Sequence, residues 1–407
     1  LQIPLNWLLF GYPKLCIIFM IITAFLYVSV LLFIAGMLAF VEEKTRWKLF
    51  HYLPAIVLLY FTVMLLSTLG LWTKTNEINQ AYSSLKGNIL PAMIFLMLLD
   101  ADLRQIKRLG GKMLLAFFAA AISIGCAFVL GFALFKGFLA PEAWKTLAAL
   151  SGSWMGGTGN MAAVQAALNV PDSSMGYTLL IDSIDYAMWV MFLLALVPMA
   201  SRFNQWTKAD GKALEEVSAN LASKQTEYSG NKTTSLLVLL SGAMLVSIGC
   251  QYIAEILPVS EFFTKTAWTV MLVTLLGVIC AVTPISKMWG GKELSSLMLY
   301  LIIGLIASRA NFNELTQAPI YIVLGLFILA IHGALMLVVA KVFKLDLFTC
   351  GIASLANIGG VASAPILAAA YSRALIPVGV LMALLGYVIG TGGGLLVGRA
   401  LAWLSVV

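Results

Sequence analysis

Two acidic residues, Asp182 and Asp185, lie three positions apart in the apolar stretch LLIDSIDYAMWVMFLLAL. In a helix, residues at this spacing lie on one face. A carboxylate inside a transmembrane helix is costly and by default marks an ion or proton path. Two on one face can bind Na⁺ through their oxygens or share a proton. With the hydroxyl of Ser183, they are predicted to form an ion-coupling site, and both are metal ligands if the ion is Na⁺. The alternative is that each carboxylate caps a helix end near the membrane surface.

Two glycine-rich stretches, SGSWMGGTGNM at 151–161 and SLANIGGVASA at 354–364, are unusual inside apolar segments. Non-helical backbone survives in a bilayer only where it is buried in protein or lines a wet cavity. Half-helix N-termini then favour an anion, and freed carbonyls favour a small cation. Close packing of small residues is the alternative, but it does not require an Asn beside the double glycine in both stretches. The predicted solute-binding residues are Ser153, Gly156, Gly157, Thr158, Asn160, Gln165, Asn357, Gly359, Gly360 and Ser363.

The composition is that of an integral membrane protein. Of 407 residues, 61% are hydrophobic and 11% are charged, and a soluble domain carries roughly a quarter charged residues. The net charge of +7 comes from Lys and Arg in short loops beside apolar segments, which is typical of cytoplasmic loops and not of nucleic-acid binding. No HExxH, GxSxG or Walker motif accompanies the two histidines, so neither an enzyme nor a cofactor other than the coupling ion is predicted.

Spanning helices must position these residues. The apolar segments predicted to span are 14–41, 52–72, 87–99, 112–138, 174–201, 234–257, 266–284, 294–308, 318–343 and 374–398, and the broken segments are 144–169 and 347–371. Placing Gly156 over Gly359 gives each half the same order of long, medium, short, long, broken and long segments. Paired broken segments in two halves are a sequence signature of a transporter binding site. The predicted domains are a first repeat at 1–200, a linker at 201–234 and a second repeat at 235–407.

The topology depends on whether the broken segments cross the membrane or re-enter from one side. If they cross, each half has six crossings and the halves are parallel. If they re-enter, each half has five crossings and the halves are inverted. The inverted arrangement, with 201–234 in the cytoplasm, places about two thirds of the 25 basic residues inside, more than either orientation of the parallel one, and is therefore favoured.

Other polar residues receive structural interpretations. Asp100 and Asp102 are expected to pair with Arg104 or Lys107 at the cytoplasmic interface. Arg309 is expected to extend to the interface, and His332 to be a satisfied core residue. For the glycines of GTGGGLLVG at 390–398, helix packing is the favoured interpretation.

Five stretches, in chain order, resemble the bacterial membrane family known as domain of unknown function 819 (DUF819), from about residue 50 onward. They are LDADLRQIKRLGGKMLLAF, GSWMGGTGNMAAVQAAL, LLIDSIDYAMW, LANIGGVASAPILAAAY and PVGVLMALLGYVIGTGGG. That family is grouped with the sodium/proton antiporters and with the bile-acid, glutamate and citrate carriers. The resemblance implies inverted repeats, paired broken segments that meet near mid-membrane, a homodimer, and movement of a core domain against a scaffold domain.

The resemblance also bears on the coupling site. The antiporters carry their essential acids on the helix after the first broken segment, where Asp182 and Asp185 lie in this sequence. No basic residue follows the second break before Arg373, so an antiporter-type lysine is absent there, which favours a symporter.

The predicted fold is an all-α polytopic membrane protein, with about five spanning helices and one broken or re-entrant segment per half, of the elevator type. The predicted function is Na⁺- or H⁺-coupled symport of a small polar solute, such as an organic anion, an amino acid or a short peptide. The predicted location is the bacterial inner membrane, where lipid and a second copy are partners and nucleic acid is not. A cation/proton antiporter and an ion channel are the alternatives. An intramembrane aspartyl hydrolase is disfavoured because both acids share one helix turn.

Overall fold

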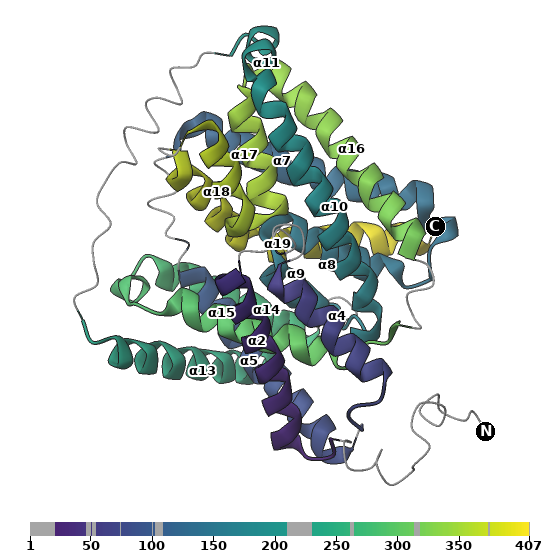
Figure 1. Ribbon diagram of the computed structural model, residues 1–407, viewed down its shortest axis with the longest axis vertical. Helices are drawn as coiled ribbons and strands as arrows, with labels where there is room; N and C mark the ends of the chain where they lie inside the picture. Colours follow the sequence, from purple (N-terminus) through teal and green to yellow (C-terminus); the bar gives the residue numbers. More distant parts are fainter. Residues whose placement is uncertain are drawn as a thin grey trace.

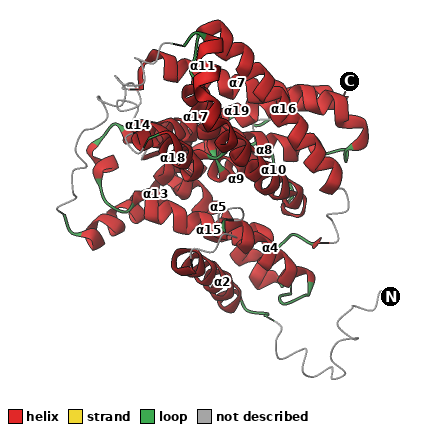
Figure 2. Ribbon diagram, turned by 45° about the horizontal axis from the view of Figure 1, so that its top comes forward, coloured by secondary structure: helices red, strands yellow, loops and turns green. Residues whose placement is uncertain are grey.

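The computed structural model describes residues 21–45, 50, 54–73, 75–99, 101, 109–209, 230–260, 264–312, 318–372 and 375–406. In this part of the chain the elements are helices, and no strand is present (Figure 2). The helices before residue 210 are α2 (Ala24–Thr45), α4 (Ala55–Thr68), α5 (Asn76–Leu99), α7 (Gly110–Phe135), α8 (Ala143–Gly156), α9 (Thr158–Ala167), α10 (Met175–Leu196) and α11 (Ala200–Thr207). Those after residue 230 are α13 (Lys232–Ile256), α14 (Lys265–Ala281), α15 (Gly291–Ala307), α16 (Ala318–Phe343), α17 (Leu347–Ile358), α18 (Gly360–Tyr371) and α19 (Ile376–Val406).

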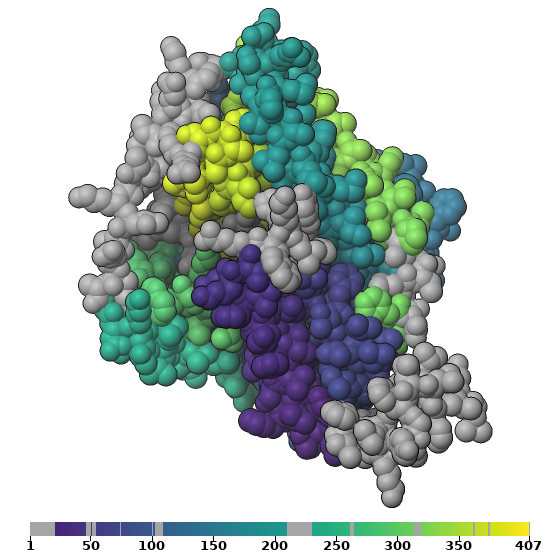
Figure 3. All heavy atoms as spheres, viewed as in Figure 1, coloured from purple at the N-terminus to yellow at the C-terminus, as the bar shows by residue number. Residues whose placement is uncertain are grey.

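Seven stretches of the described chain are long and apolar enough to cross a membrane, which confirms the prediction of a multi-pass membrane protein. They are Ala24–Thr45, Asn76–Leu99, Gly110–Phe138, Asp172–Thr207, Lys232–Ile256, Pro319–Phe343 and Ile376–Val406. Large apolar side chains stay exposed on outward faces, for example Phe25, Phe33 and Leu245. In the space-filling view α2 (purple) lies on the surface, where such side chains would meet lipid (Figure 3).

The third predicted span, 87–99, is too short, because α5 begins at Asn76. The polar half NEINQAYSSLKGN lowers the mean hydropathy without preventing helix formation. The Thr75 hydroxyl accepts a hydrogen bond from Ile78 N at 3.2 Å, and Glu77 lies in the first turn. Both features stabilise a helix start. The extension places Tyr82 and Lys86 on the same helix as the buried apolar half.

Two hydrophobic cores divide the described helices. The first is built from α2, α4, α5, α13, α14 and α15, and it also includes α9. The second is built from α7, α8, α10, α16, α17, α18 and α19. Figure 1 shows most of the first group in the lower part of the molecule and the second in the upper part. A few residues of α8, α10 and α19 also belong to the first core, so the two cores meet along these helices, and α9 lies in the first core.

The first broken segment folds back on itself. It bends at Gly157, whose φ of 87° and ψ of 173° suit glycine. On either side of the bend, a methyl group on Gly152 would lie 2.9 Å from the Val164 side chain. The hydroxyl of Thr178, at the start of α10, donates to Thr146 O near the start of α8 at 3.3 Å. The start of α8 and the start of α10 therefore lie side by side, so the chain leaves the hairpin next to the point where it entered.

The second broken segment has the same form. It bends at Gly359 and Gly360, the latter with φ of 56°. The rings of Phe348, at the start of α17, and Tyr371, at the end of α18, have centroids 5.1 Å apart. The prediction of two glycine-broken segments is confirmed, while their re-entry into a membrane stays a prediction.

The order of six elements recurs in the two halves. Helices α2, α4, α5, α7, the pair α8–α9 and α10 correspond to α13, α14, α15, α16, the pair α17–α18 and α19. Corresponding helices also meet, since α5 packs on α15 and α7 on α16. Within the predicted linker, residues 201–207 belong to α11 and residues 232–234 to α13, and residues 210–229 lie outside the described part. The division into domains remains a prediction.

Candidate membrane-embedded site

Helix α10 carries a carboxylate to the first break. Asp182 Oδ1 accepts hydrogen bonds from the Ser153 hydroxyl at 3.0 Å and from the Trp154 indole N–H at 3.1 Å. Both donors lie in the last turn of α8. The structure therefore brings together Asp182 and Ser153, which were predicted from different patterns in the sequence, and it adds Trp154.

Asp185, one turn further along α10, has a different environment. Its side chain is fully buried, and neither carboxylate oxygen has a hydrogen-bond partner among the described residues. It lies directly against Gly325 of α16, where an added methyl group would overlap the carboxylate. No cluster of three or more His, Cys, Asp or Glu residues forms in the described chain, so the two aspartates gain no third such ligand there.

Helix α10 also reaches the second break. A methyl group on Gly359 would lie 2.5 Å from the Tyr186 ring. Ser363, one turn into α18, is fully buried at the same place. Asp182 and Tyr186 thus connect a single helix to both glycine breaks. Figures 1 and 3 show α10 in teal beside α18.

The two half-helices end next to each other. A methyl group on Gly386 of α19 would lie 3.2 Å from Met155 O, near the end of α8, and 3.3 Å from Ala356 O, near the end of α17. The carbonyl ends of both half-helices therefore face the same point on α19. The two breaks, which the family resemblance implied would meet, lie close together in the structure.

Asparagines beside the breaks are hydrogen-bonded locally. Asn160 donates to Gly156 O at 2.6 Å and accepts from the Thr391 hydroxyl at 2.6 Å. Asn357 donates to Ala353 O at 2.9 Å. The Oδ1 atom of Asn357 is buried and has no partner among the described residues. The first asparagine thus ties its break to α19, while the second retains a free acceptor.

Glycines at 390–398 pack against α8, as predicted. Methyl groups on Gly390 and Gly394 would lie 2.7 Å from Gly156 Cα and 2.9 Å from Gly152 Cα, respectively. Here the backbones of the two helices are in direct contact. Small residues that permit such an approach are typical of membrane helix interfaces.

Two predicted site residues do not join this arrangement. The Ser183 hydroxyl donates to Leu179 O of its own helix at 2.5 Å, so the structure does not bring it to the carboxylates. Gln165 lies at the other end of α9, where its side-chain N–H donates to Asp172 Oδ1 at 2.6 Å. Gly157 and Thr158 are half-buried at the first break, and their role in solute binding stays a prediction.

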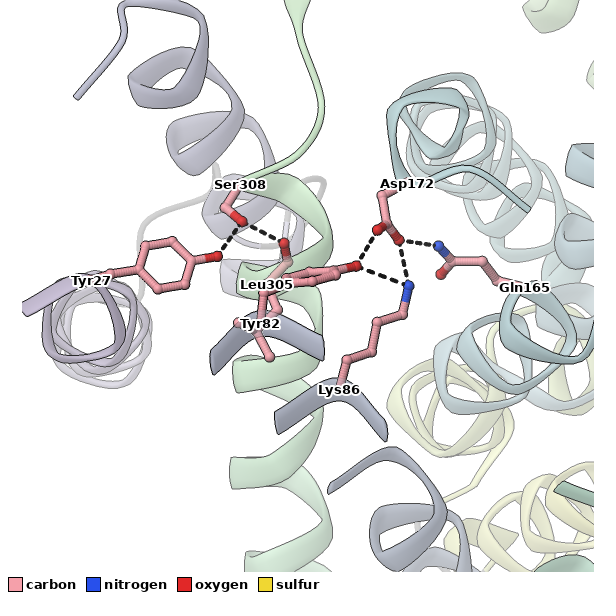
Figure 4. Close-up of polar contacts among 7 residues, drawn as sticks. All are labelled: Tyr27, Tyr82, Lys86, Gln165, Asp172, Leu305 and Ser308. Carbon is pink, nitrogen blue, oxygen red and sulfur yellow. Dashed lines mark hydrogen bonds and ion pairs between the residues drawn. The ribbon is translucent and has the colours of Figure 1, made fainter. Parts of the chain in front are cut away.

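Gln165 belongs to a second polar cluster, shown in Figure 4. Asp172 accepts hydrogen bonds from Gln165, from the Tyr82 hydroxyl and from Lys86, whose Nζ lies 2.5 Å from Oδ1. Sequence reasoning missed Tyr82, Lys86 and Asp172. The available signals were a lysine next to a spanning segment and an Asp that follows a Pro after the broken segment.

Three structural interpretations have different outcomes. His332 is fully buried and satisfied, as predicted, because Nδ1 pairs with the Ser123 hydroxyl at 2.7 Å and Nε2 with the Ser354 hydroxyl at 2.8 Å. The interfacial position of Arg309 stays a prediction. Its guanidinium lies 4.3 Å from the Tyr82 ring centroid, and its Nη2 atom is buried. Asp100, Asp102, Arg104 and Lys107 lie outside the described residues.

The fold and the apolar helices define a multi-pass helical membrane protein. The family model described as "Protein of unknown function (DUF819)" matches residues 29–404, and the chain belongs to this family. It is also similar to the "Uncharacterized membrane protein YjcL" of Bacillus subtilis (strain 168). The two are 27% identical over 350 residues, which cover 80% of this chain and 84% of that protein. The name of this relative agrees with the membrane assignment.

Proposed function

We propose that this protein is a secondary active transporter that couples the inward movement of a cation to uptake of a small polar solute. One observation carries the proposal: α10 places Asp182 at the first break and Tyr186 at the second, with a buried, unpartnered Asp185 between them. Acidic residues inside spanning helices typically mark ion paths. Broken helices in corresponding positions of two repeats typically form transporter binding sites.

The surroundings of Asp185 favour H⁺ over Na⁺ as the coupling ion. Sodium requires several oxygen ligands, as other hard cations do. Gly325, which lies against the Asp185 carboxylate, and Ile181, one turn earlier on α10, supply no side-chain oxygen. An ionised carboxylate without a partner is costly in such a place, whereas a protonated one is neutral. Asp182, which has two hydrogen-bond donors, is the better candidate if Na⁺ binds.

The fold-back of both broken segments supports inverted repeats. If each segment returns to the side from which it came, each half contributes five through-going helices. The second half then enters the membrane from the opposite side. The two cores support an elevator-type movement, in which the core around α7, α16 and the half-helices α8, α17 and α18 moves against the other. Homodimerisation and the bacterial inner membrane are part of the same proposal.

Two alternatives use the same site. A cation/proton antiporter would move its ions in opposite directions without a solute, and a channel would let the solute pass without accumulating it. Uptake of labelled solute above the external concentration, driven by a pH gradient, separates symport from both.

The test is transport by the full-length chain in proteoliposomes that contain a pH-sensitive dye. Probe solutes are succinate, L-alanine and L-alanyl-L-alanine, each added with an inward H⁺ or Na⁺ gradient. The wild type is expected to accumulate at least one probe and to acidify the lumen with it. Asp185→Asn, which keeps the shape but removes the titratable group, is expected to lower gradient-driven accumulation by about tenfold or more, the size of a loss of general acid–base or ion function.

Glu142→Gln is the matched control, because Glu142 is an exposed carboxylate in an ion pair with Lys145 at 2.9 Å. It is expected to transport like the wild type. Coupled accumulation that is unchanged in Asp185→Asn would contradict the role of Asp185. Movement of the probes down their own gradients only, in every variant, would contradict secondary active transport.

A further inference from the structure

A cavity of about 520 Å³ lies among α5, α13, α14 and the end of α9. This volume is within the usual range of small-molecule sites, about 300–1,000 Å³. The cavity is separate from the glycine breaks, but α9 connects the two. Thr158 begins α9 at the first break, and Gln165 lines the cavity seven residues later, a rise of about 10 Å along the helix.

Two ion pairs line the cavity, and each joins one lysine to one carboxylate. The inner pair joins Lys86 and Asp172 at 2.5 Å, and their side chains are only 19% and 14% exposed. The outer pair joins Lys265 and Glu255, whose side chains are more than half exposed. The four groups have no net formal charge. Such a lining favours a ligand that carries a positive and a negative group, because an ion of either sign alone would meet a like charge.

Gln165 adds an unused acceptor to the inner pair. Its side chain is fully buried, and Oε1 has no hydrogen-bond partner among the described residues. The backbone fixes it in place, because Asn169 ends α9 with a left-handed φ of 50° and Val170 N donates to Gln165 O at 2.9 Å. A buried acceptor without a donor is costly. A ligand N–H group would satisfy it.

We propose that this cavity binds a zwitterionic solute. The ligand's ammonium group donates to Asp172 and to Gln165 Oε1, and its carboxylate accepts from Lys86, which turns from Asp172 toward the ligand. In Figure 4, Lys86 and Tyr82 occupy the positions on Asp172 that the ammonium group takes. The site rests on the proposed function in one respect, since it assigns a chemical class to the transported solute.

The test measures binding to the purified full-length protein, by calorimetry and by thermal unfolding, without any transport. The zwitterionic probes are L-alanine, L-glutamine and L-alanyl-L-alanine. N-acetyl-L-alanine lacks the ammonium group, L-alaninamide lacks the carboxylate, and succinate is an anion. At least one zwitterion is expected to bind and to raise the melting temperature by mass action. The singly charged probes and succinate are expected to bind about tenfold or more weakly, because each loses a hydrogen bond to a charged group.

Variants identify the site. Lys86→Met and Gln165→Leu are each expected to raise the Kd of the zwitterion by about tenfold or more. Lys145→Met is the matched control, since Lys145 is also paired with a carboxylate at 2.9 Å but lies away from the cavity. It is expected to leave Kd within about twofold. Leucine is similar in volume to glutamine, so Gln165→Leu keeps the test valid if Lys86→Met unfolds.

Three results would each overturn the proposal. The first is that no zwitterion binds, and the second is that the singly charged probes bind as tightly as the zwitterions. The third is that Lys86→Met and Lys145→Met change Kd equally. These results are distinguishable from failure of the proposed function. A zwitterion that binds here, in a protein that accumulates none of the probes in proteoliposomes, supports the cavity as a binding site and contradicts secondary transport. If succinate is the only probe that accumulates with the ion, the result contradicts the zwitterion site in this cavity but supports secondary transport.

Discussion

The contact between α8 and α19 makes a quantitative prediction about stability. Gly390 lies where α19 passes the end of α8, and a methyl group there would lie 2.7 Å from Gly156 Cα and 2.8 Å from Asn160 Cγ. These distances are roughly 1 Å shorter than the best separation of two carbons. Neither neighbour is the flexible end of a long side chain, so the helices must separate. Overpacking of this kind costs about 1–3 kcal/mol.

Gly392 provides the control on the same helix. A methyl group there would have no heavy atom within 4 Å, and the residue is exposed. Replacing a helical glycine with alanine in open space stabilises by about 0.5–1 kcal/mol. Both glycines lie inside α19 and share this gain, so Gly390→Ala is expected to be less stable than Gly392→Ala by about the overpacking cost, about 1–3 kcal/mol in the free energy of unfolding.

The assay is denaturant unfolding of the purified protein in detergent, followed by tryptophan fluorescence. Gly390→Ala is also expected to lose coupled transport, because the displaced Asn160 ties the first break to α19 through Thr391. Equal stability of the two alanine variants would refute the backbone contact between α8 and α19. It would also refute the assignment of the glycines at 390–398 to packing.

Two further predictions concern caps and buried acceptors near the breaks. Asp346→Ala is expected to destabilise the protein by about 0.5–2 kcal/mol. Asp346 caps α17 by accepting hydrogen bonds from Thr349 N at 2.8 Å and from the Thr349 hydroxyl at 2.7 Å. Asp346→Asn, measured by the same unfolding assay, should recover most of the lost stability. Thr391→Val is expected to cost about 1–3 kcal/mol, since it leaves the buried Asn160 Oδ1 without its donor, and wild-type stability in this variant would show that the hydrogen bond contributes nothing.

Much of the fold could be predicted because a bilayer imposes length and polarity on each helix. The segment predicted at 318–343 agrees with α16 at both ends, and the break placed at Gly156–Gly157 lies where α8 ends and Gly157 bends the chain. Two helices are clearly longer than predicted: α5, whose polar first half is helical although its composition resembles a loop, and α19, which extends to Val406, eight residues beyond the predicted end. Hydropathy detects the part of a helix that meets lipid and not the part that extends beyond it.

The candidate site could be predicted only in part. Asp182 and Ser153 were found because broken segments and intramembrane acids are each unusual in a local stretch of sequence. The cluster around Asp172 was missed because Tyr82 and Lys86 are 90 and 86 residues away in the chain. The isolation of Asp185 was also not predictable, since it depends on a glycine of α16 lying against it.

The boundary between the two cores has a mechanical consequence for the duplicated hairpins. In the first, α8 packs mainly in one core and α9 in the other, while in the second both α17 and α18 pack in the same core. Because α9 packs on α8 and α19 as well as on α5 and α14, any sliding of one core past the other would have to separate α9 from one of these two pairs of helices or bend the chain at Gly157. The second hairpin can travel as a rigid unit. Of the two hairpins, only the first places its half-helices in different cores.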